Sequence, residues 1–286
     1  SHMKLSDEFY STMATEASKS KIEVLAVVHG NFGEGSATSS HFARGLCFMP
    51  NLRSLNLDGV KLSDEFYSTM ATKALRSKIE ELNHWNADLG SAASSYYARG
   101  LCSMPNLQSL YLYSVKLSDE FYSAMLAEAS RSKIEKLKHK TADLGSVASS
   151  QYAKGLCFMP NLQSLNLDGV KLSEEFYSTM AIEASTSKIE KLTHERADLG
   201  SDASSHYARG LCSMPNLQSL YLYSVKLSDE FYSTMASEAS KSKIEELTIS
   251  AIYLYSAASS HYARGLCLMP NLQSLNLYNV KLSDEF

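Results

Sequence analysis

One motif recurs along the chain at nearly constant intervals. The sequence Lys-Leu-Ser-Asp-Glu-Phe, with Glu in place of Asp once, begins at Lys4, Lys61, Lys116, Lys171, Lys226 and Lys281. The intervals after Lys61 are all equal, and the first interval is slightly longer. A fixed period of about 55 residues predicts an array of structural repeats that share one continuous core. The hydrophobic content of 44% is sufficient for such a core.

Each period contains two segments that predict β-strands. Both follow the pattern Leu-x-x-Leu-x-Leu, whose alternation is typical of a half-buried strand. The first type begins at Leu52, Leu107, Leu162, Leu217 and Leu272, and the second begins at Ile22, Ile79, Ile134, Ile189 and Ile244. The two types alternate at almost equal spacing, except for a longer interval between Ile22 and Leu52. The additional residues predict a longer Gly-rich loop near residues 29–36.

Between the strands, apolar residues recur every four positions, which predicts helices. Examples are the sets Phe9, Met13, Ala17 and Ala93, Tyr97, Leu101. Ser6 is a predicted N-cap, because acidic residues follow it in the first turn, where the helix dipole favours negative charge. Pro105 and its copies mark the exit of the second helix type toward the next strand.

These strand–loop–helix units resemble leucine-rich repeats of the ribonuclease-inhibitor-like class, from Lys4 to Phe286. The resemblance implies an α/β horseshoe solenoid, with a parallel sheet on the concave face and helices on the convex face. We expect a single domain over residues 4–286, made of about ten units in five double repeats. Residues 1–3 are predicted to be a cloning remnant. Because the chain starts and stops on the same motif, it is predicted to be a fragment of a longer protein.

The chain departs from the usual repeat pattern after each strand. Leucine-rich repeats usually carry Asn or Cys three residues after the last strand leucine. Here that position holds Val60, Ala87 and their copies. The loop backbone must therefore find other hydrogen-bond partners.

The strand positions predicted to point into the concave face vary between copies, whereas the framework hardly changes. A diversified binding surface explains this pattern, although drift after duplication is an alternative because exposed positions tolerate most substitutions. The predicted ligand-binding residues are Glu81, Asn83, Trp85, Tyr111, Tyr113, Lys136, Lys138, Lys140, Lys191, Thr193, Glu195, Tyr221 and Tyr223.

The aromatic residues of this set are candidate contact residues. Exposed Tyr pairs supply contact area at low entropic cost, although they could equally form a packing ladder without a ligand. Trp85 is either a candidate hot spot or a cover for Tyr111. The three lysines Lys136, Lys138 and Lys140 could bind an anion or form a solvated face.

Catalytic and metal-binding motifs are absent from the sequence. It contains no phosphate-binding Gly-rich loop, no His-Glu-x-x-His, no Cys-x-x-Cys and no nucleophile elbow, so we predict neither an enzyme nor a cofactor. His84, His139 and His194 occupy a core position of the second strand type. Because alternate strands lie about 9–10 Å apart, no shared metal site is expected. We predict half-buried histidines that bond to backbone groups.

Charge and cysteine usage restrict the class of partner and the compartment. The net charge of −4 gives no basic field for nucleic acid or an anionic membrane surface. No apolar run approaches the roughly 18 residues of a membrane span. The five cysteines each follow Gly-Leu at one position per repeat, which predicts free, buried thiols rather than disulfides. These features favour a reducing, cytoplasmic location.

The sequences of these repeats are similar to those in leucine-rich repeat domains of NLR innate-immune receptors, including those of invertebrate deuterostomes. Residues 98–101 (Ala-Arg-Gly-Leu) and 104–107 (Met-Pro-Asn-Leu) carry this resemblance. It implies recognition of a protein or other macromolecular ligand on the concave face. A secreted variable receptor, an enzyme inhibitor of the ribonuclease-inhibitor type and a purely structural array remain alternatives. Exposed stacking faces at the ends predict end-to-end self-association.

Overall fold

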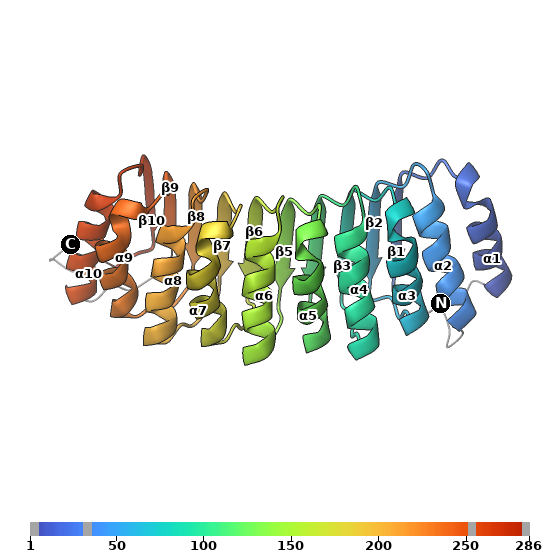
Figure 1. Ribbon diagram of the computed structural model, residues 1–286, viewed down its shortest axis with the longest axis horizontal. Coiled ribbons are helices and arrows are strands. Elements are labelled where there is room, and N and C mark those ends of the chain that lie inside the picture. The colour runs from blue at the N-terminus through green and yellow to red at the C-terminus, as the bar shows by residue number, and fades with distance from the viewer. Residues whose placement is uncertain (1–5, 31–35, 251–255, 282–286) are drawn as a thin grey trace. The chain divides into compact units, whose positions relative to one another are not determined.

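Strands and helices alternate along the chain in the computed structural model, which describes residues 6–30, 36–250 and 256–281 (Figure 1). Each strand has five residues: β1 (Val24–Val28), β2 (Ser54–Asp58), β3 (Glu81–Trp85), β4 (Ser109–Tyr113), β5 (Lys136–Lys140), β6 (Ser164–Asp168), β7 (Lys191–Glu195), β8 (Ser219–Tyr223), β9 (Glu246–Ser250) and β10 (Ser274–Tyr278). Among the described residues they form one ten-stranded sheet whose order follows the chain. The predicted solenoid with a parallel sheet is confirmed.

Two helix types alternate between the strands. The shorter helices are α1 (Asp7–Glu16), α3 (Asp64–Lys73), α5 (Asp119–Glu128), α7 (Glu174–Glu183) and α9 (Asp229–Glu238). Each continues into a 3-10 helix: η1 (Ala17–Lys19), η2 (Ala74–Arg76), η3 (Ala129–Arg131), η4 (Ala184–Thr186) and η5 (Ala239–Lys241). The longer helices are α2 (Ser36–Phe48), α4 (Ser91–Ser103), α6 (Ser146–Phe158), α8 (Ser201–Ser213) and α10 (Ser256–Leu268).

The chain forms two compact units. One unit runs through Lys138 and includes Met159–Asn161, and the other contains His139–Phe158 and continues from Leu162. Residues 1–3, the predicted cloning remnant, and residues 31–35 of the predicted long loop lie outside the described residues. The single domain over residues 4–286 stays a prediction. In the described part of the chain, no helix is both long and apolar enough to cross a membrane.

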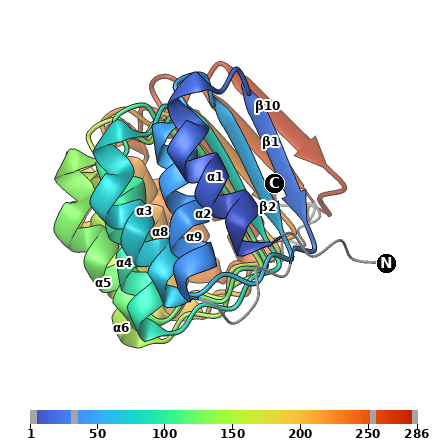
Figure 2. The same ribbon diagram turned by 90° about the vertical axis from the view of Figure 1, so that its right-hand side faces the viewer.

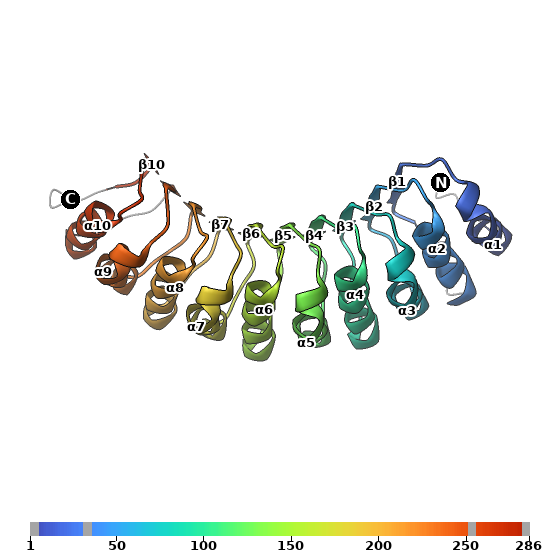
Figure 3. The same cartoon turned by 45° about the horizontal axis from the view of Figure 1, so that its top comes forward.

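Strand alternation places the core on one side of the sheet. In β2, Leu55 and Leu57 are buried, while Ser54, Asn56 and Asp58 are only partly covered. In each unit, Figure 3 shows the helices on one side of the strands, and the burial of the leucines places the core on that side. Figure 2 shows the same layering at the first repeats, with α1 and α2 packed beside β1 and β2.

The predicted helix signals are confirmed. The Ser6 side chain accepts a hydrogen bond from the Phe9 N–H at 3.3 Å, so Ser6 is the N-cap of α1. Ala93, Tyr97 and Leu101 lie on α4 and are all buried, because residues four apart share one helix face. Burial of such faces between sheet and helices is the dominant stabilising contribution to the fold.

After the strands, hydrogen bonds between backbone groups take the place of those that the usual Asn side chain would make. The residue that follows a strand adopts a positive φ, as in Gly59 (58°) and Asn86 (53°). Its N–H donates to the carbonyl of the last residue of the next strand, for example Gly59 to Trp85 and Asn86 to Tyr113, both at 2.9 Å. These backbone N–H groups of the loops are therefore hydrogen-bonded to backbone carbonyls, which the sequence alone did not identify.

The Met-Pro-Asn-Leu motif adds one side-chain hydrogen bond to each repeat. Its Asn amide donates to the carbonyl of the Ser that precedes the second strand type, at 2.9–3.1 Å. These Asn–Ser pairs are Asn51–Ser20, Asn106–Ser77, Asn161–Ser132, Asn216–Ser187 and Asn271–Ser242. The two leucine-rich units of each period are thus joined in the same way at each of these positions.

The cysteines are free, as predicted, but one of them is not buried. Cys47, Cys102, Cys157 and Cys212 are buried, whereas Cys267 on α10 is exposed. Burial raises the pKa of each buried thiol to about 12. Because the thiolate is the reactive form, these four cysteines act as small apolar packing residues.

Candidate ligand-binding face

The face of the sheet opposite the helices is called the open face here. It carries the side chains at the first, third and fifth positions of each strand. None of the predicted ligand-binding residues is fully buried. They occupy these positions as follows: Glu81, Asn83 and Trp85 on β3; Tyr111 and Tyr113 on β4; Lys136, Lys138 and Lys140 on β5; Lys191, Thr193 and Glu195 on β7; Tyr221 and Tyr223 on β8. Their role in binding stays a prediction.

An aromatic cluster lies on the open face of the first unit. Trp85 and Tyr113 are directly opposite each other in the register of β3 and β4. Their rings meet edge to face, with centroids 4.8 Å apart at 71°. The Tyr111 ring is parallel to the Tyr113 ring at 6.4 Å. The alternative in which Trp85 covers Tyr111 is therefore not the arrangement found, because parallel register places Trp85 against Tyr113.

Two lysines of β5 flank this aromatic cluster. The Lys138 Nζ lies 5.9 Å from the centre of the Tyr113 ring, within the range of a cation–π interaction. Lys136 is exposed at the start of the strand. Among the described residues, neither ammonium group has a carboxylate within 4.0 Å. Both positive charges are therefore available to an acidic group on a ligand.

The third lysine of β5 has a structural partner. Lys140 Nζ lies 2.7 Å from a carboxylate oxygen of Asp168 in the second unit, and the Arg196 Nε donates to the other oxygen at 2.8 Å. Burial alone would raise the pKa of Asp168, but these two cations hold it below its ordinary value. Of the three predicted lysines, Lys140 thus forms an ion pair within the protein, and the ligand-binding role of all three stays a prediction.

Charge reversal should separate these lysine roles. Lys140→Glu would place a second carboxylate beside Asp168, so we expect the free energy of unfolding to fall by about 2 kcal/mol. Lys136→Glu should change it by less than about 0.5 kcal/mol, because Lys136 is exposed. Urea titrations followed by circular dichroism measure both values. Equal losses for the two variants would contradict this assignment.

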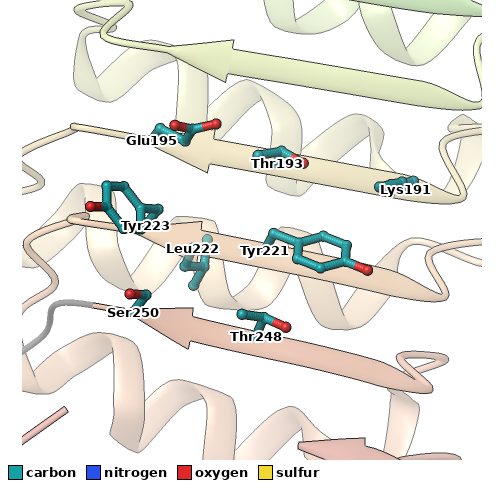
Figure 4. Close-up of a pocket in the computed structure, with 8 residues that line it drawn as sticks. All are labelled: Lys191, Thr193, Glu195, Tyr221, Leu222, Tyr223, Thr248 and Ser250. Carbon is teal, nitrogen blue, oxygen red and sulfur yellow. The ribbon is translucent and has the colours of Figure 1, made fainter. Parts of the chain in front are cut away.

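A hollow of about 380 Å³ lies on the open face of the second unit (Figure 4). Its lining residues come from three adjacent strands: Lys191, Thr193, Glu195, Tyr221, Leu222, Tyr223, Thr248 and Ser250. The Lys191 Nζ lies 4.8 Å from the centre of the Tyr221 ring. The Tyr221 hydroxyl donates to the Glu246 carboxylate at 3.2 Å. Thr248, Ser250 and Glu246 were not among the predicted residues, although the same alternation places them on this face.

The three strand histidines are fully buried, which corrects the prediction of half-buried groups bonded to backbone. Each Nδ1 lies 3.0–3.2 Å from the hydroxyl oxygen of a tyrosine on the following helix. The pairs are His84–Tyr97, His139–Tyr152 and His194–Tyr207. Burial lowers the pKa of each histidine to about 4. The constant separation of 13 residues was the sequence signal for this pairing.

In the described part of the chain, no three side chains of His, Cys, Asp or Glu are grouped so that they could hold a metal ion. The buried histidines face the helices rather than the open face. The residues of the open face offer aromatic stacking, cation–π contacts and ion pairs, which are the chemistry of macromolecular recognition.

Part of the chain matches a known family. Residues 106–126 match the family described as Leucine Rich Repeat. No curated protein matches the chain. Similar solved structures are those of the leucine-rich repeat-containing protein LegL7 from Legionella pneumophila (14% identity, TM-score 0.47, 93% of this chain and 87% of that chain) and of a protein from Bacteroides fragilis (11% identity, TM-score 0.46, 100% and 74%). A chain of the TLR13–ssRNA13 complex has 16% identity and a TM-score of 0.44, covering 83% of this chain and 37% of its own length.

Proposed function

Because the chain folds as a leucine-rich repeat solenoid, we propose that it is a recognition domain whose open face binds a partner protein. The observation that carries this proposal is Trp85, which is 39% exposed although it packs edge to face on Tyr113. A large aromatic side chain on a rigid strand provides contact area with little loss of conformational entropy. Such residues are enriched among the hot spots of protein interfaces.

The charges around Trp85 add specificity to this proposed contact. Lys136 and Lys138 lie on the same face, and Glu81 is held by a hydrogen bond from the Asn83 amide at 2.8 Å. Two lysines without carboxylate partners favour a partner that carries acidic groups near an apolar or aromatic centre. The ligand-binding role of the remaining residues on β7 and β8 belongs to the same proposal.

The finer assignment is a ligand-sensing domain of an intracellular innate-immune receptor of the NLR type. Two observations support this assignment. The repeat sequences are similar to those of NLR receptors, and the framework residues are constant between repeats whereas the residues of the open face vary. Four buried thiols with strongly raised pKa values are consistent with the proposed cytoplasmic location. The full reading frame tests this assignment, because a receptor of this type also carries a nucleotide-binding signalling module.

Replacing Trp85 tests the binding role directly. A peptide selected from a random display library against the wild-type chain serves as the ligand. We expect Trp85→Ala to weaken its binding about 30-fold, which corresponds to a hot-spot loss of about 2 kcal/mol. Isothermal titration calorimetry measures the dissociation constants, and the unfolding midpoint shows whether the variant stays folded.

A matched control lies on the helical side of the first unit. Leu75 in η2 is also a large apolar residue and is more exposed than Trp85. Leu75→Ala should leave the affinity unchanged, because Leu75 lies away from the open face. If Leu75→Ala abolished binding while Trp85→Ala had no effect, the open face would not be the binding surface.

A further inference from the structure

The chain contains two versions of one tyrosine-pair site, and among the described residues only the first has another ring and a cation beside its second tyrosine. Tyr111 and Tyr113 on β4 correspond to Tyr221 and Tyr223 on β8, two full periods later in the same repeat framework. In the first unit, Trp85 and Lys138 cover Tyr113. The corresponding residues of the second unit are Glu195 and Thr248, and both line the hollow. Smaller or differently directed side chains thus leave space around Tyr223.

The site around Tyr113 in the first unit indicates which chemical group the hollow around Tyr223 accepts. Lys138 places an ammonium group over the Tyr113 ring at 5.9 Å, so this framework already holds a cation on its tyrosine. Thr248 stands in place of that lysine in the second unit. Tyr223 is 48% exposed, and its ring has no aromatic or cation contact with any other residue that the structure describes.

Acceptor groups on the two neighbouring strands flank Tyr223. Glu195, Tyr223 and Ser250 form one row across β7, β8 and β9, and Figure 4 shows Glu195 and Ser250 on opposite sides of the ring. Ser250 is only 5% exposed, and its Oγ has no hydrogen-bond partner among the residues that the structure describes. Among the described residues, no cation lies within 4.0 Å of the Glu195 carboxylate.

We propose that the hollow receives a lysine or arginine side chain of the partner protein. The cation would lie over the Tyr223 ring and pair with the Glu195 carboxylate. An acidic side chain would be repelled by Glu195, and an apolar one would leave this carboxylate without a cation. Lys191 does not occupy this place, because its ammonium group lies over Tyr221, two residues earlier on β8. The proposal rests on the proposed function, since it names one contact of the same open face.

Short peptides test the proposal without knowledge of the natural partner. The probes are the blocked tripeptides Ala-Arg-Ala and Ala-Lys-Ala, with Ala-Glu-Ala and Ala-Leu-Ala for comparison. Titrations are followed by the NMR signals of the tyrosine rings. We expect the basic peptides to bind about 5- to 30-fold more tightly than the others, as a cation–π contact in a partly dry site provides.

A substitution that copies a residue of the first unit should block the hollow. Thr248→Lys introduces the lysine that the first unit has at position 138, so the protein's own cation should fill the hollow and remove binding of the basic peptides. Ile182→Lys adds the same charge at an exposed position of α7, on the helical side of the same unit, and it should leave their binding unchanged. Circular dichroism and the unfolding midpoint confirm that both variants are folded.

Three results would overturn the proposal. They are equal binding of acidic and basic peptides, no binding of either basic peptide, and unchanged binding by a folded Thr248→Lys protein. Each can be distinguished from failure of the proposed function. If Trp85→Ala still reduces binding of the display-selected peptide, then the open face binds protein and only the assignment of the hollow is wrong.

Discussion

Acidification from pH 6.5 to about 4 is expected to destabilise the folded chain steeply. His84, His139 and His194 have an ordinary pKa of 6.5 when unfolded and a pKa of about 4 when buried in the fold. Between these values the unfolded chain binds protons that the folded chain excludes, so stability falls as the pH falls. The contribution is fully present above pH 6.5 and is lost by about pH 4.

The expected size of this effect is up to about 3 kcal/mol for each histidine across that interval. Urea titrations at successive pH values measure it as the slope of the unfolding free energy against pH. A slope of up to three protons is expected, provided that the histidines remain buried. Asp168, whose pKa is lowered from an ordinary value of 3.8, contributes mainly below the pH interval of the histidines.

The first repeat provides the control for the histidines. Val27 and Phe42 occupy the places that His84 and Tyr97 take in the next repeat, so an apolar pair fits this framework. The double variant His84→Val, Tyr97→Phe removes the titrating group without leaving a buried hydroxyl unpaired. We expect the slope to decrease by one proton. An unchanged slope would show that His84 does not stay neutral in the folded chain.

Replacing Phe66 is expected to cost about 3–5 kcal/mol of unfolding free energy, the usual loss for a buried phenylalanine changed to alanine. Phe66 on α3 is fully buried and packs against Phe42 at 5.7 Å and Tyr67 at 5.2 Å. Phe66→Ala therefore removes apolar burial and leaves a cavity that rigid neighbours cannot fill. Urea titration at neutral pH measures the loss.

Phe9 is the matched control for Phe66 because both belong to the same repeated motif. Phe9 is 47% exposed on α1, so Phe9→Ala should cost less than about 1 kcal/mol. The two substitutions make the same chemical change at equivalent positions of the repeat. Similar losses would mean that both positions are equally buried in solution, which would contradict the packing at the first repeat.

The architecture could be predicted from the sequence because each repeat provides the same signals several times. The alternation around Leu55 and Leu57, the N-cap at Ser6 and the helical spacing from Ala93 to Leu101 each appear where they were expected. Periodicity determines which side of an element is buried, and stacking then requires adjacent strands to be parallel. The placement of the candidate residues on the open face follows from the same alternation.

Contacts between side chains could not be predicted in the same way. The Trp85–Tyr113 pair depends on the register between β3 and β4, and the Lys140–Asp168 pair depends on which neighbouring strand carries a carboxylate. The histidine–tyrosine pairs depend on how the following helix packs against the strand that carries the histidine. Single-sequence patterns specify faces of elements, whereas these contacts depend on the three-dimensional distances between them.

The repeated hydrogen bond of the Met-Pro-Asn-Leu asparagine has an evolutionary consequence. Because each full period carries this bond between its own two units, a block of one full period that is lost or duplicated by unequal crossing-over keeps the bond intact. Such an exchange would bring different open-face residues side by side without any new core mutation. Genes built in this way could generate new combinations of recognition residues faster than point substitution alone.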